Sequence, residues 1–140
     1  MKPTLVDSNV ILDTVLEDPQ WYEWSALQLM RCVNQAPLVI NPLIYAEVSV
    51  GFEQIEEVED ALPSEFFRRE ELPWEAAFLA GKCFLKYRKQ GGQKRSPLPD
   101  FYIGAHAVVL GYRLLTRDTV RFQTYFPSLE VITPENPSVP

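Results

Sequence analysis

The sequence contains little histidine and little cysteine, with one His and two Cys in 140 residues. The two thiols, Cys32 and Cys83, lie far apart and form no Cys-x-x-Cys pattern. We interpret both as reduced, buried side chains. With so few nitrogen and sulfur ligands, the sequence excludes a zinc site built from a His and Cys cluster.

Long apolar segments, internal repeats and low-complexity segments are also absent. No apolar run approaches the roughly 18 residues that span a bilayer, and Asp7 interrupts the start before a signal-peptide core could form. We therefore expect a cytoplasmic protein with no membrane contact. The hydrophobic fraction of 46% is typical of a folded domain. We assign one domain to residues 1–133 and a Pro-rich tail to residues 134–140.

Acidic residues are missing from one long stretch, although the net charge is -6. Between Ala76 and Pro99 there is no acid, and the basic residues there are Lys82, Lys86, Arg88, Lys89, Lys94 and Arg95. Between Glu53 and Glu75 acids dominate instead. The two stretches are either solvated helix faces or a basic rim for phosphates beside an acidic centre.

Apolar segments alternate with helical patterns along the chain, which predicts an α/β fold with a mainly parallel sheet and helices on both faces. The expected strands are 4–6, 37–40, 65–72, 112–116 and 129–133. The expected helices are 19–35, 42–52, 55–62, 73–92, 100–111 and 119–126, with a loop at 93–99. In the first of these helices, an i+3 pattern predicts a core stripe of Trp21, Trp24, Leu27, Met30 and Val33.

Four acids stand where the predicted strands end or the next helices begin. Asp7 ends the first strand and Asp118 follows the fourth. Asp100 opens the helix that runs back to the fourth strand, and Glu47 lies on the helix after the second. Sites in parallel sheets form outside the carboxyl ends of the strands, so we expect the four to face one cleft.

Four carboxylates in one cleft repel each other, and a divalent cation removes that cost. Oxygen ligands without a His or Cys cluster favour Mg²⁺, for which Mn²⁺ can substitute. Such an ion polarises a phosphoryl group and activates bound water. The residues therefore predict metal-assisted phosphodiester hydrolysis.

Four segments resemble the PIN-domain nucleases, specifically the VapC-type toxins of bacterial toxin–antitoxin pairs. They are "LVDSNVILD", "NPLIYAEVSVGF", "LPDFYIGAHAVVLGYRLLTRD" and "RFQTYFP". The resemblance implies a PIN-like fold and a Mg²⁺-dependent endoribonuclease that cuts structured RNA, usually tRNA or rRNA. It also implies a homodimer and a cognate antitoxin that inserts a segment near the acidic site.

Carried over residue by residue, the family's acidic quartet falls on Asp7, Glu47, Asp100 and Asp118. These residues would hold the metal or orient its water. Asn9 and Thr116 match polar positions that support the ligands. For RNA contact we select the following basic residues: Lys86, Arg88, Lys89 and Arg117.

Single residues also have simpler interpretations. Asp7 could cap a turn, and Asp100 could be an acid favoured by its place at a helix start. We interpret Asp13 as a solvated or supporting acid. Arg117 and Arg121 contact phosphate or balance nearby acids.

His106 and the Trp21–Trp24 pair are interpreted as structural. At about 100° per residue, His106 points away from the face that Asp100 occupies, so we expect a core or interface histidine. The tryptophans are expected in the core or a dimer surface.

Two other functions remain open. A catalytically silent PIN-fold module would bind RNA or protein, and the intact quartet argues against it. A phosphate-accepting receiver domain also gathers acids at strand ends, but it needs a Lys that "YRLLTRD" lacks, and Glu47 would have no role in it. A DNA nuclease of related fold is disfavoured because the short chain lacks added elements to hold a duplex.

Overall fold

The computed structural model describes residues 1–94 and 98–134. Arg95, part of the predicted loop and nearly all of the predicted tail lie outside the described residues. Within them, five strands form one sheet in the order β3-β2-β1-β4-β5, and each adjacent pair is parallel. The strands are β1 Thr4–Val6, β2 Leu38–Ile40, β3 Phe67–Arg69, β4 Arg113–Leu115 and β5 Val131–Ile132. This confirms the predicted α/β class and its parallel sheet.

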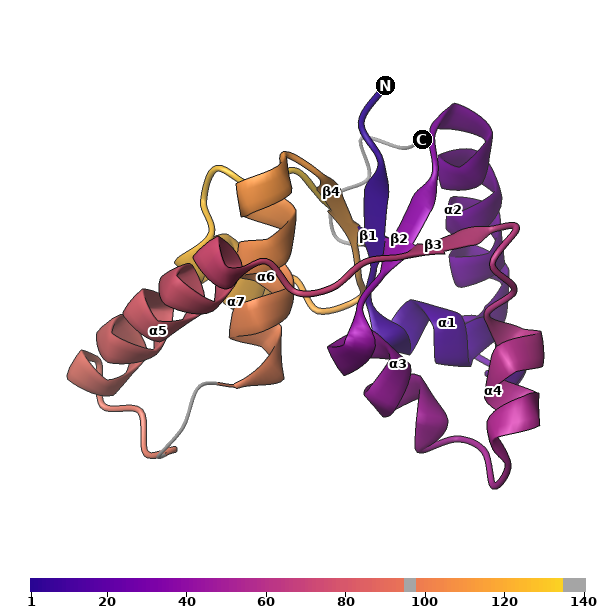
Figure 1. Cartoon of the computed structure of the whole chain (residues 1–140), viewed down its shortest axis with the longest axis horizontal. Helices are drawn as coiled ribbons and strands as arrows, with labels where there is room; N and C mark the ends of the chain where they lie inside the picture. Colours follow the sequence, from indigo (N-terminus) through magenta and orange to yellow (C-terminus); the bar gives the residue numbers. More distant parts are fainter. Residues whose placement is uncertain (95–97, 135–140) are drawn as a thin grey trace.

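Helices cover both faces of this sheet. Figure 1 shows α5, α6 and α7 grouped on one side and α1 to α4 on the other. Their bounds are α1 Ser8–Val15, α2 Tyr22–Gln35, α3 Pro42–Ser49, α4 Ile55–Ala61, α5 Trp74–Lys89, α6 Pro99–Leu110 and α7 Val120–Tyr125. Two of these ends follow the sequence signals closely. Asn41 caps α3 by accepting from the Ile44 amide, and Gly111 ends α6 with a φ of 71°.

The predicted core stripe of α2 is confirmed only in part, by Trp24 and Val33, which pack partly buried against the core. The buried side chains of this helix are Ser25, Gln28 and Cys32, whereas Leu27 and Met30 are exposed. Ser25 turns inward because its hydroxyl donates to the buried carboxylate of Asp13 at 2.7 Å. A buried polar group needs such a partner, so this contact favours a helix face that an apolar pattern does not reveal.

The order of the strands determines where a site can form. The chain passes from β1 to β2 on one side, and later returns to place β4 on the other side of β1. The strand order therefore reverses between β1 and β4, and ligands in open parallel sheets bind outside the carboxyl ends at such a point. Among the described residues, no helix is both long and apolar enough to cross a membrane.

Candidate active site

Asp7 leaves β1 at the reversal point, where hydrogen bonds fix both its backbone and its side chain. Its amide donates to the Leu115 carbonyl at 2.9 Å, which ties it to β4. Its carboxylate accepts from the Ser8 amide and from the Thr116 hydroxyl, both at 2.8 Å. The side chain is only 4% exposed. Asp7 also caps α1, so the simpler interpretation as a cap holds alongside its place in the cluster.

Glu47 reaches the same edge from α3. The Ser8 hydroxyl donates to its carboxylate at 3.0 Å, so the residue after Asp7 links two of the predicted acids. Ser8 was not selected from the sequence. The available signal was its position inside the Asp-Ser-Asn segment, immediately after a strand-ending acid.

Thr116 and Asn9, which the sequence analysis assigned to support the acids, lie beside Asp7 and the segment that carries Asp118. The Thr116 hydroxyl donates to Asp7 and accepts from the Asp118 amide at 3.0 Å. Asn9 lies 3.4 Å from the same hydroxyl, and its side-chain oxygen accepts from the Arg117 amide at 3.3 Å. One buried hydroxyl therefore fixes both Asp7 and the backbone that carries Asp118.

Asp100 and Asp118 complete the edge. Asp100 lies in the first turn of α6 and remains 28% exposed, with the Arg121 guanidinium 3.9 Å away. Asp118 is exposed and lines a shallow groove beside α7. Helix α3, which carries Glu47, also contacts α6, which carries Asp100.

The acids influence one another electrostatically. Burial raises the pKa of Asp7 to about 6. The hydrogen bonds from Thr116 and Ser8 lower this pKa, whereas the charges of Glu47 and Asp118 raise it. Burial also raises the pKa of Asp100 to about 6, with contributions from Asp7 and Asp118, while Arg121 lowers it. The pKa of Glu47 is raised by burial and by the charge of Asp100. The four predicted acids therefore share one field, which disfavours their joint ionisation.

The donor chemistry of this cluster suits a hard divalent cation. All four side chains offer carboxylate oxygens. Among the charge contacts described for these four residues, one involves a basic side chain, which is Arg121 beside Asp100. Within residues 1–94 and 98–134, no three acidic, His or Cys side chains are yet close enough together to ligate one ion. The residues fit Mg²⁺ or Mn²⁺ by charge and donor type, and side-chain rotation would have to bring them closer.

Asp13 is not a solvated acid as one interpretation expected. It is 3% exposed and pairs with Arg117, whose Nε lies 2.7 Å from its carboxylate. The Arg117 guanidinium also lies over the Trp21 ring, 5.1 Å from its centroid. Of the two interpretations of Arg117, these contacts favour balancing an acid, so its predicted role in RNA binding has little support.

His106 is a core residue, as expected. It is fully buried, and its ring nitrogens contact the Asn41 side chain at 3.0 Å and the Glu70 carboxylate at 3.3 Å. Burial lowers its pKa, and Glu70 opposes that change. His106 therefore connects α6 to the cap of α3 and makes no contact with the acidic cluster.

Three of the four basic residues selected for RNA contact lie in the last turn of α5: Lys86, Arg88 and Lys89. All three are exposed. The Lys86 ammonium lies 5.6 Å from the centroid of Tyr125, which lines the same groove as Asp118. The basic turn therefore begins beside the acidic edge.

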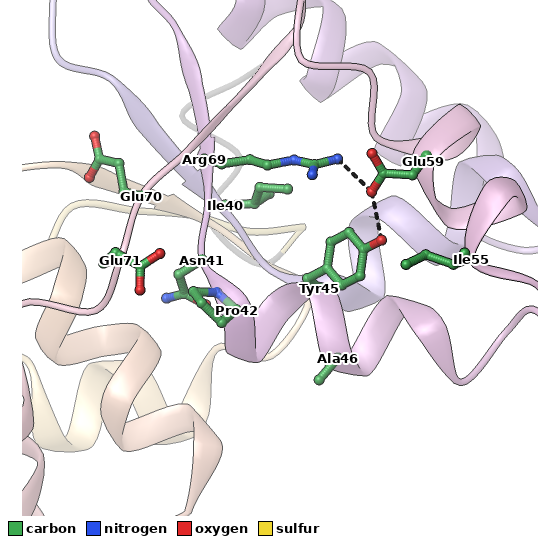
Figure 2. Close-up of a pocket in the computed structure, with 10 residues that line it drawn as sticks. All are labelled: Ile40, Asn41, Pro42, Tyr45, Ala46, Ile55, Glu59, Arg69, Glu70 and Glu71. Carbon is green, nitrogen blue, oxygen red and sulfur yellow. Dashed lines mark hydrogen bonds and ion pairs between the residues drawn. The ribbon is translucent and has the colours of Figure 1, made fainter.

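A larger cavity of about 420 Å³ lies on the other side of α3 (Figure 2). Tyr45 and Arg69 both bond to Glu59 there, at 2.6 and 3.0 Å. Pro42, Ala46 and Ile55 add apolar walls to the cavity. None of the four predicted acids lines this cavity, so it is separate from the acidic cluster.

Comparison with known proteins finds matches to both the sequence and the fold of this chain. The family model of the PIN domain matches residues 4–125. FitAcB from Neisseria gonorrhoeae has a TM-score of 0.71 at 19% identity, over 95% of this chain and 99% of that chain. VapBC2 from Rickettsia felis, bound to a DNA fragment from its promoter, has a TM-score of 0.70 at 17% identity, over 94% of this chain and 98% of that chain. A toxin–antitoxin complex from Klebsiella pneumoniae has a TM-score of 0.65 at 23% identity, over 94% of this chain and 97% of that chain.

No curated protein gives a significant match to the sequence. The solved structures are so distant in sequence that they show the fold alone.

Proposed function

Because the chain belongs to the PIN domain family, we propose that it is a Mg²⁺-dependent endoribonuclease and the toxin of a toxin–antitoxin pair. One observation carries the nuclease part. Asp7 and Asp100 lie 93 residues apart in sequence, yet at the strand-order reversal the charge of Asp7 adds to the raised pKa of Asp100, and the charge of Asp118 adds to the raised pKa of both. A cluster that stores repulsion in this way is suited to a divalent cation.

In this proposal Asp7, Glu47, Asp100 and Asp118 hold the ion. When bound, Mg²⁺ would neutralise charge on a phosphate and favour the attacking form of water. The chain's own contribution is to fix the ligands: Ser8 holds Glu47, and Thr116 holds Asp7 and the Asp118 backbone. Arg121 offers a positive charge beside Asp100 at which a phosphate can be received.

The substrate and partners follow from the resemblance and are supported by surface features. The exposed last turn of α5 supports RNA, and we propose structured RNA such as tRNA or rRNA. The similar structures include a toxin–antitoxin complex, which supports a cognate antitoxin. Trp74, Phe78 and Leu85 are exposed by 89%, 69% and 49% along one face of α5, which supports a homodimer contact.

The decisive variant is Asp100→Asn, because Asn is tolerated at a helix start and a loss would be chemical. Purified parent protein should cut RNA with Mg²⁺ and not with EDTA, and its expression should arrest bacterial growth. Asp100→Asn should lose at least about 100-fold in cleavage rate, because changing a mere outer-shell partner of a metal ligand already costs about 10- to 100-fold, and it should permit growth. Cleavage by Asp100→Asn at a tenth of the parent rate would remove it from the site. RNA binding without cleavage by the parent would favour the catalytically silent module.

A further inference from the structure

We propose that the shallow groove between the end of α5 and α7 is a subsite for an unpaired nucleobase of the RNA, adjacent to the phosphate that is cut. The groove has a volume of about 330 Å³. Its lining residues are Tyr87, Asp118, Val120, Arg121, Thr124 and Tyr125. The position of this subsite beside the phosphate that is cut rests on the proposed nuclease function, whereas the binding of a base rests on the groove itself.

The groove is continuous with the acidic cluster. Asp118 belongs to both, and Arg121 reaches from the groove to within 3.9 Å of the Asp100 carboxylate. A nucleotide with its phosphate at the acids would therefore have the groove as its neighbouring surface. In this position the groove contacts the nucleotide next to the phosphate, whereas none of the four predicted acids lines the cavity of Figure 2.

The two tyrosines are held in place before any ligand binds. Both rings pack edge-on against Phe101, at centroid distances of 5.7 Å for Tyr87 and 5.0 Å for Tyr125. The Tyr125 hydroxyl is also bonded to Gln90 at 3.1 Å. Rings that are already fixed lose little conformational freedom when a flat ligand packs on them.

The charges around the groove suit an anionic nucleotide. Lys86 lies over the Tyr125 ring, and Arg121 lies over Phe101 with its centroid 5.8 Å away. Aromatic rings combined with Arg or Lys are the usual platform for an unpaired base, because the ring stacks and the cation meets the phosphate. A base inside a duplex has both faces covered by its neighbours, so the groove selects single-stranded or looped segments.

The test compares two probes of equal charge on the parent protein. One is a fluorescently labelled single-stranded oligoribonucleotide, and the other is the same length of ribose-phosphate chain without bases. In EDTA, the probe with bases should bind about fivefold more tightly or better, which is the lower end of the effect of stacking one base. Equal affinity, including no measurable binding of either probe, would overturn the inference.

A matched pair of variants locates the effect. Thr124 lines the groove, and Gln123, next to it on α7, is exposed and does not line it. Thr124→Trp should fill the groove and abolish the preference for bases, while Gln123→Trp should keep it. Tyr125→Leu provides a second test that removes a ring without adding bulk. If all three variants keep the parent's preference, the bases bind elsewhere and the inference fails.

The same proteins separate this inference from the nuclease proposal. Cleavage that persists without any preference for bases would retain the nuclease and discard the subsite. A preference for bases that depends on Thr124, in a protein that never cuts RNA, would retain the subsite and discard the nuclease. Binding of a peptide or protein that Thr124→Trp abolishes, together with equal affinities for the two RNA probes, would identify the groove as a protein-binding surface, against the inference.

Discussion

Thr116 is the residue on which the geometry of the acidic edge most depends. Its buried hydroxyl donates to Asp7 and accepts from the Asp118 amide. Thr116→Val removes one hydrogen-bond partner from the Asp7 carboxylate and one from the Asp118 amide, so we expect a loss of about 1–3 kcal/mol in the free energy of unfolding. The hydrogen bond from Thr116 lowers the pKa of Asp7, so its removal should raise that pKa further. Chemical denaturation measures the first effect, and NMR titration of the Asp7 carboxyl measures the second.

The chain offers a matched control three residues away. The Thr119 hydroxyl is also buried, but it has no hydrogen-bond partner among the described residues. Thr119→Val should therefore be neutral or stabilising, because it removes a buried polar group that nothing satisfies. If the two valine variants have equal stability, the hydroxyl of Thr116 does not support the cluster.

For single residues, the sequence predicted the positions of the acids better than their contacts. Asp7, Glu47, Asp100 and Asp118 were selected by strand ends, helix starts and family resemblance, and the structure brings them into one field. Their catalytic role stays a prediction. Ser8 and the Asp13–Arg117 pair were missed or misread, because these contacts join residues up to 104 apart in sequence. No local pattern encodes such a partner.

Among the secondary-structure elements, every strand that the sequence predicted is present, because short apolar runs bounded by turn residues are a local signal. The orientation of α2 was not predictable in this way. Its buried face contains Ser25 because Asp13 requires a donor, and Asp13 in turn is held by Arg117 from the β4–α7 segment. An amphipathic pattern indicates only where apolar side chains are buried. When a helix buries polar side chains, the pattern therefore predicts the wrong buried face.

The end of α5 gives a prediction about RNA binding. Neutralising Lys86, Arg88 and Lys89 together to Gln should weaken binding and flatten its salt dependence. For single-stranded RNA, three lost phosphate contacts would reduce the slope of log affinity against log salt by about 2. Fluorescence anisotropy at several salt concentrations measures this slope. The maximal cleavage rate at saturating RNA should change less, since these side chains hold no metal.

The control for that variant is the neutralisation of Lys2 and Arg31, exposed cations on β1's amino side and on α2. Their loss changes the net charge without touching the acidic edge, so the slope should change little. An unchanged slope in the α5 variant would place the basic turn on a surface that RNA does not contact.

For the whole molecule, the raised pKa values predict how stability depends on pH. Asp7 and Asp100 have pKa values of about 6 in the folded protein, against an ordinary value of 3.8. Between these two pKa values the folded protein binds more protons than the unfolded chain. The two groups therefore contribute their full stabilisation below about pH 3.8, and this contribution to the free energy of unfolding is lost as pH rises through about 6.

In EDTA, the melting temperature should therefore include a rise as pH falls from about 6.5 to about 4.5. Asp7→Asn should flatten that rise, because one of the two groups no longer titrates. Superimposable pH profiles for the parent and Asp7→Asn would show that Asp7 does not carry the effect.

If the four distant carboxylates act as one cation-binding cluster, the loss of one should change how the protein responds to metal, and melting curves of the parent and Asp7→Asn with EDTA or Mn²⁺ measure that response. In EDTA, Asp7→Asn should be more stable than the parent by about 1 kcal/mol, because it relieves repulsion. Mn²⁺ should stabilise the parent by mass action and the variant much less. Asp13→Asn, which breaks the buried pair with Arg117, should be less stable than the parent but gain as much from Mn²⁺. If Asp7→Asn gains as much from Mn²⁺ as the parent, the carboxylates do not form one site.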